Sequence, residues 1–201
     1  MRARLLAALL AALALRPALA EDAEPQDNAE SAPARSPAYR PFVSARGTFA
    51  CDAPSAGWQA FEEDTPSGSS AHFLGPVEDI GNWRAALPVH LIDKSQPGFV
   101  PLDDAVKRER RSEPSAERSA GPVRRARVAH GSARRFEVTE TRLLPPDRLP
   151  SAPVTLHHFV AFVPAGDGYF IIKLSSSRET YLDRRELFER VLQTFRILGY
   201  P

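Results

Sequence analysis

The chain has 201 residues, of which 43% are hydrophobic and 25% are charged. These values are close to those of globular proteins and exclude a wholly disordered chain. The length suits one domain preceded by a leader. A single cysteine, Cys51, excludes an intrachain disulfide framework and a Cys-rich zinc site.

Residues 1–20 have the pattern of a secretory signal peptide. An apolar stretch from Leu5 to Leu15 follows two arginines, and residues 18–20 (Ala-Leu-Ala) form a small-x-small cleavage site. An uncleaved N-terminal anchor is the alternative. The pattern predicts a secreted or periplasmic protein. In such a compartment we expect a lone Cys51 to be buried and inert; an intermolecular disulfide is the other possibility.

Cleavage would remove three of the 26 basic residues and none of the 25 acidic ones. The resulting near-neutral balance argues against nucleic-acid binding. No apolar run after the leader approaches the roughly 20 residues of a membrane-spanning helix, so we expect no transmembrane segment after cleavage.

Residues 21–41 are rich in Pro, Ala, Ser and acidic residues, with almost no large apolar side chain before Tyr39. Such a segment cannot bury enough surface to offset the entropy lost on ordering. It is therefore predicted to be a disordered linker, and residues 42–201 are expected to form one domain.

Short apolar segments separated by turn residues predict strands in the first half of this domain. They are Gly47–Cys51, which Asp52-Ala53-Pro54 should end, and then Trp58–Glu63, Ala71–Leu74 and Leu87–Ile92. A short helix is expected over Asp103–Arg111. Two further strands, Arg124–Ala129 and Ala133–Arg142, flank a turn signal at Gly131-Ser132. The four prolines of residues 143–153 predict a loop.

The segment Val154–Leu174 is apolar at nearly every position, apart from a short turn at Gly166-Asp167-Gly168. A strand with two apolar faces lies inside a sheet that is covered on both sides. The short turn makes the pair an antiparallel hairpin.

A helix is expected from Leu182 to Phe195, because apolar residues recur there at spacings of three and four. Its polar side should carry Arg184, Arg185, Glu186, Glu189 and Arg190. Thr180 or Asp183 is the expected cap at its start and Gly199 at its end.

Three local patterns resemble the PsbP-like family, whose name comes from an extrinsic subunit of photosystem II. The first is the strand, proline and Gly-Trp pair between Phe49 and Trp58; the second is the strand entry from Gly131 to Phe136. The third is the apolar hairpin followed by a helix that ends in Leu-Gln-Thr-Phe-Arg at 192–196. The resemblance implies an α+β fold, with an antiparallel β-sheet sandwiched between helices, and a non-catalytic role. No functional residue is transferred from the family.

Candidate catalytic and metal sites have simpler explanations. His157 and His158 are neighbours on a predicted strand, so they point to opposite faces and cannot easily share one ion. His158 is expected to be a hydrogen-bonded core histidine. The sequence contains no Gly-x-Ser-x-Gly elbow, phosphate loop or His-Glu-x-x-His motif. We therefore expect no enzyme, no metal site and no cofactor.

The segment from Lys107 to Arg135 is strongly basic, with nine arginines and one lysine against three glutamates. Arginine suits bidentate contacts to carboxylates and phosphates. A solvated loop is the alternative interpretation. The expected contact residues are Arg108, Arg110, Arg111, Arg124, Arg125 and Arg127.

The sequence thus predicts a non-enzymatic, secreted or periplasmic binding or assembly domain. It would dock an extracytoplasmic protein partner or an anionic envelope surface through this Arg-rich edge. The alternative is a carrier of a small ligand or metal, with a pocket between sheet and helix. A hydrolase would require a serine, a histidine and a carboxylate that converge in space.

Overall fold

The computed structural model describes residues 38–65, 68–78, 80, 83–113, 117–146 and 149–199. The predicted signal peptide and most of the predicted linker lie outside these residues. Strand β1 spans Tyr39–Val43, so the predicted linker boundary at residue 41 is too late. Tyr39 packs against the apolar core. The last residues of the predicted linker therefore belong to the folded domain.

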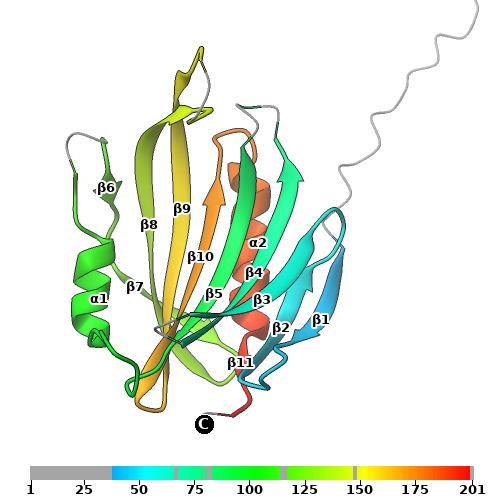
Figure 1. The fold of residues 1–201 in the computed structure, drawn as a ribbon, viewed down its shortest axis with the longest axis vertical. Coiled ribbons are helices and arrows are strands. Elements are labelled where there is room, and N and C mark those ends of the chain that lie inside the picture. Colours follow the sequence, from blue (N-terminus) through cyan, green and yellow to red (C-terminus); the bar gives the residue numbers. More distant parts are fainter. Residues whose placement is uncertain are drawn as a thin grey trace, which may run out of the picture. The chain divides into compact units, whose positions relative to one another are not determined.

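The described strands and helices follow one another along the chain as Figure 1 shows. After β1 come β2 (Phe49–Pro54), β3 (Gln59–Thr65), β4 (Gly68–Val77), β5 (Arg84–Ile92), α1 (Leu102–Glu109), β6 (Ser119–Ala120), β7 (Arg124–Val128), β8 (Gly131–Leu144), β9 (Ala152–Ala165), β10 (Gly168–Ser176), α2 (Tyr181–Thr194) and β11 (Arg196–Ile197).

Among the described strands, the larger sheet has the order β3-β4-β5-β10-β9-β8-β6, and β7 also pairs with β8. The smaller sheet has the order β1-β2-β11. All the pairings are antiparallel. The hairpin predicted over Val154–Leu174 is therefore confirmed, as β9 and β10 at the centre of the larger sheet.

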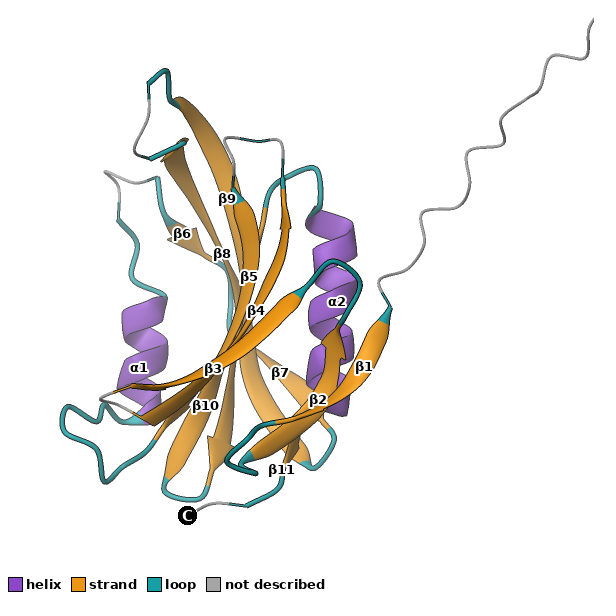
Figure 2. Cartoon of the chain, turned by 45° about the vertical axis from the view of Figure 1, so that its right-hand side comes forward, coloured by secondary structure: helices purple, strands orange, loops and turns teal. Residues whose placement is uncertain are grey.

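The larger sheet is covered on two faces, which confirms the predicted antiparallel sheet between helices (Figure 2). On one face, α2 and the smaller sheet cover a cluster that includes Phe159, Phe170 and Leu187. On the other face, Val106 of α1 packs with a separate cluster that includes Phe162. Alternate side chains of β9 and β10 enter opposite clusters, as the period of a β-strand requires.

Several element ends differ from the predicted ones. Strand β2 continues through Pro54, because Pro54 pairs with Tyr39 of β1. Strands β8 and β9 extend into the predicted loop at 143–153, with Leu144 opposite Ala152. The loop between these strands is therefore shorter than the spacing of the prolines predicts.

Helix α2 has the predicted position, and Thr180 occupies the N-cap position as one of the two predicted caps. Its side chain makes no capping hydrogen bond; the Thr180 hydroxyl instead donates to Glu78. The helix ends because Phe195 adopts an extended conformation, so Gly199 does not close it. Arg184 is buried rather than on the polar side, since it lies over the ring of Trp58. No helix of the described residues is both long and apolar enough to span a bilayer.

Candidate binding site

The basic strand β7 distributes its arginines over both faces of the larger sheet. In the β7–β8 register, Arg124 lies opposite Arg135, and Arg125 lies opposite Arg134. Side chains that lie directly opposite each other share a face of the sheet. Arg124 therefore lies on the α2 side with Arg135, whereas Arg125 lies on the α1 side with Arg134.

Helix α1 and the turn after it place their arginines differently. Arg108 and Arg111 are exposed, whereas Arg110 is half-buried. The Arg110 guanidinium lies 5.9 Å from the centre of the Phe136 ring and donates a 3.2 Å hydrogen bond to the Gly121 carbonyl. Arg110 thus has a structural role, and it differs in this from the exposed members of the predicted contact set.

Most of the other cations of the basic segment are paired within the fold. Lys107 pairs with Asp104, Arg118 with Glu109 and Glu140, Arg134 with Asp103, and Arg135 with Glu189. The hydrogen bond from Arg134 is the main cause that lowers the pKa of Asp103. Within the described part of the chain, five arginines of the segment have no ion pair: Arg108, Arg111, Arg124, Arg125 and Arg127. We call these five residues the arginine surface; it extends around strand β7, because Arg124 lies on the α2 side of the larger sheet and Arg125 on the α1 side.

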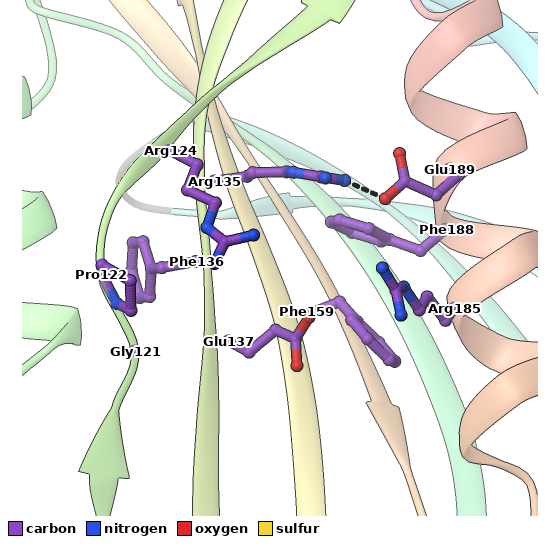
Figure 3. A pocket seen from close by; sticks show the side chains of 10 residues that line it. All are labelled: Gly121, Pro122, Arg124, Arg135, Phe136, Glu137, Phe159, Arg185, Phe188 and Glu189. Atoms are coloured by element: carbon purple, nitrogen blue, oxygen red, sulfur yellow. Dashed lines mark hydrogen bonds and ion pairs between the residues drawn. The ribbon is translucent and has the colours of Figure 1, made fainter.

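A pocket of about 190 Å³ opens between β8 and α2, next to Arg124 (Figure 3). Phe159 of β9 and Phe188 of α2 form its apolar floor, with their ring centroids 5.7 Å apart. Gly121 and Pro122 form one wall, and the Gly121 amide is fixed by a 2.8 Å hydrogen bond to the Glu137 carbonyl. The pocket thus lies between sheet and helix, where the alternative interpretation of the sequence places a ligand site.

The charged residues around this pocket are only partly neutralised by one another. Arg135 forms an ion pair with Glu189, and the Tyr181 hydroxyl donates a 2.8 Å hydrogen bond to Glu137. Burial, together with this bond, raises the pKa of Tyr181. Arg124 and Arg185 also line the pocket, and neither has an ion pair within the described residues.

A serine, a histidine and a glutamate do converge on the other face of the sheet. The Ser175 hydroxyl lies 2.8 Å from His158 Nδ1, and His158 Nε2 lies 3.0 Å from Glu140 Oε1. His158 is 4% exposed, so the predicted hydrogen-bonded core histidine is confirmed. Burial first, and then Lys173, lower the pKa of His158, and the ring is neutral at neutral pH.

This cluster does not have the geometry of a hydrolase triad. In such a triad the acid holds Nδ1 and the serine meets Nε2, whereas here the two ring nitrogens are exchanged. Glu140 Oε1 also lies 2.5 Å from Arg142 Nε, and Oε2 lies 3.3 Å from Arg118. Ser175 and His158 are direct cross-strand partners, so a packing role explains their contact.

His157 and His158 face opposite sides of the sheet, as predicted for neighbours on a strand. His157 contacts the Tyr181 ring on the α2 side, while His158 faces Glu140 on the opposite side. Among the residues that the structure describes, no three His, Cys, Asp or Glu side chains are grouped to hold a metal ion.

Sequence reasoning did not single out Arg185 or Glu137 as site residues. The sequence places Arg185 on the polar side of the last helix, and Glu137 lies within the predicted strand Ala133–Arg142 without a motif of its own. For Arg185, the helical spacing could have indicated the site. Arg185 precedes the apolar Phe188 by three residues, and residues three apart lie on the same side of a helix.

Comparison with known proteins identifies the architecture alone. No protein-family model and no curated protein matches this chain. The Ran-binding protein Mog1p of Saccharomyces cerevisiae matches 82% of this chain and 97% of its own, with a TM-score of 0.50 and 12% identity. LpqN of Mycobacterium tuberculosis, involved in cell envelope biogenesis, matches 81% of this chain and 91% of its own, with a TM-score of 0.50 and 11% identity.

A solution structure of the cyanobacterial PsbP, CyanoP, from Synechocystis matches 81% of this chain and 93% of its own, with a TM-score of 0.45 and 12% identity. At 11–12% identity, the matches to Mog1p and LpqN show the fold alone, and this fold is of the α+β kind that the PsbP-like resemblance implies.

Proposed function

We propose that this chain is a non-enzymatic binding domain that docks an acidic segment of a secreted or envelope protein on the arginine surface. The observation that carries the proposal is that five arginines have no ion pair within the described residues, in a segment whose other cations are mostly paired. They are Arg108, Arg111, Arg124, Arg125 and Arg127. Arginine guanidinium groups are weakly hydrated and bind carboxylates in a bidentate way.

The position of these residues also supports docking. Among the described strands, β7 pairs only with β8, and its three arginines are exposed. Charges at an exposed rim accelerate association and select partners of opposite sign. The shared fold with the Ran-binding protein Mog1p is compatible with a binding role for such an architecture.

The experiment compares two triple variants by crosslinking in cells that make the protein. Arg124→Glu, Arg125→Glu and Arg127→Glu together reverse the charge of β7. Arg84→Glu, Arg178→Glu and Arg196→Glu make the same change at exposed arginines elsewhere. We expect the β7 variant to lose the crosslinked partner and the control variant to keep it.

The partner is then purified, and its affinity is measured at several salt concentrations. A docking role predicts an affinity that falls with salt in the unchanged protein and at least about tenfold weaker binding by the β7 variant. Equal capture of the same partner by both triple variants would contradict the proposal. Binding to phosphatidylglycerol vesicles without a protein partner would assign the arginine surface to an anionic membrane instead.

A further inference from the structure

The pocket between β8 and α2 has an aromatic interior that is large enough for one ring. Its floor is the pair Phe159 and Phe188, both of which are almost fully buried. A cavity of about 150 Å³ lined by apolar side chains binds benzene, and this pocket measures about 190 Å³. The space therefore fits a six-membered ring with one small substituent.

The charges on the walls define what that substituent must be. Arg124 reaches from the β7 side towards α2, and Arg185 enters the same space from α2 (Figure 3). Their charges are not cancelled by an ion pair within the described residues. A single negative charge on the ligand would lie between two guanidinium groups and the aromatic floor.

The glutamates on the walls limit the ligand to one negative charge. Glu189 is held by Arg135, Glu137 accepts a hydrogen bond from Tyr181, and both residues line the pocket. They would repel a phosphate dianion, since like charges at short range are unfavourable. A carboxylate with one charge and a planar shape matches the fork of a guanidinium group.

We propose that this pocket binds an aromatic monocarboxylate, with its ring on Phe159 and Phe188 and its carboxylate between Arg124 and Arg185. The ligand is either a free small molecule of the size of phenylacetate or the terminal carboxylate of a polypeptide that ends in an aromatic residue. The pocket shares Arg124 with the arginine surface, whereas Arg185 lines the pocket and lies outside that surface.

The test is calorimetric titration of the purified domain with phenylacetate, N-acetylphenylalanine, phenylacetamide and phenyl phosphate. Phenylacetamide has the ring without the charge, and phenyl phosphate has the ring with a second charge. We expect binding of the two carboxylates and at least about tenfold weaker binding of the amide and of the phosphate. Tighter binding of N-acetylphenylalanine than of phenylacetate identifies a polypeptide end as the source, and the reverse order identifies a free acid.

Two single substitutions and a matched control locate the site. Arg124→Gln and Arg185→Gln should each weaken carboxylate binding about tenfold, whereas Arg125→Gln should not, because Arg125 lies on the other face of β7. Thermal unfolding confirms that each variant is folded. No binding of either carboxylate at about 10 mM, or equal binding by all three variants, would overturn the proposal. Arg185→Gln also separates the two proposals, because it should leave partner docking intact.

Discussion

The guanidinium carbon of Arg184 lies 5.1 Å from the centre of the Trp58 ring, and its Nη2 donates a 3.2 Å hydrogen bond to Glu78. Glu78 also accepts hydrogen bonds from the hydroxyl groups of Ser177 (2.8 Å) and Thr180 (3.2 Å). One carboxylate from the end of β4 thus holds the first turn of α2, where the helix dipole also favours a negative charge.

Replacing Glu78 by alanine should destabilise the domain by about 3 kcal/mol, because Arg184 would remain buried without its partner. Urea unfolding followed by circular dichroism measures the loss. The matched control is Glu179→Ala, which removes an exposed glutamate next to the same helix and should change stability by less than about 0.5 kcal/mol. Equal effects of the two substitutions would show that Glu78 does not hold α2.

The buried His158 should make the domain sensitive to mild acid. Burial lowers the pKa of His158 from 6.5 to about 4 in the folded state, so below pH 6.5 the unfolded chain takes up a proton that the folded chain does not. The stability present above pH 6.5 is therefore lost as the pH falls towards 4, at up to about 1.4 kcal/mol per pH unit.

The measurement is urea unfolding at several pH values for the unchanged protein, His158→Gln and the control His130→Gln. His158→Gln should lose less stability between pH 6.5 and pH 4 than the unchanged protein. His130 lies in the exposed turn between β7 and β8, and its substitution should leave the acid loss in place. Parallel curves for His158→Gln and the unchanged protein would remove His158 as the cause.

The six predicted contact arginines should divide by their effect on stability. Arg110→Glu should cost about 2 kcal/mol, because it removes the contact with Phe136 and the hydrogen bond to Gly121. Arg108→Glu, on the exposed side of α1, should cost less than about 0.5 kcal/mol. Thermal unfolding of the two variants tests this, and an Arg110→Glu variant as stable as Arg108→Glu would contradict the structural role of Arg110.

Cys51 should react only when the domain unfolds. Its side chain is buried and forms no disulfide, and burial, with a smaller effect of Asp52, raises the pKa of the thiol to about 12. Since the thiolate is the reactive form, we expect no labelling by Ellman's reagent in buffer and complete labelling in urea. Rapid labelling of the folded protein would contradict the burial of this residue.

The sequence predicted much of the architecture because the strongest patterns belong to buried elements. Apolar residues recur regularly throughout Val154–Leu174 and α2. Most observed ends of β9, β10 and α2 lie within one or two residues of the predicted ends. The extent of β8 and β9 was underestimated, because cross-strand pairing carries them through residues that locally favour a turn. Pairing between distant segments is not encoded in a short window of sequence.

The candidate site could be predicted only in part, for a similar reason. The basic segment is visible in the sequence, but the pairing of Arg135 with Glu189 joins residues 54 positions apart. The same holds for Arg184, whose burial depends on Trp58 and Glu78 rather than on helical periodicity. Which cations remain without partners is therefore a property of the fold.

Arg124 and Arg125 are adjacent in the chain but belong to opposite faces of the sheet. A change at one of these positions can alter the charge on its own face and leave the other face untouched. A substitution at position 124 changes the charge beside the pocket between β8 and α2, whereas a substitution at position 125 changes the charge on the α1 side. One short strand thus contributes charge to both faces of the sheet, one residue at a time.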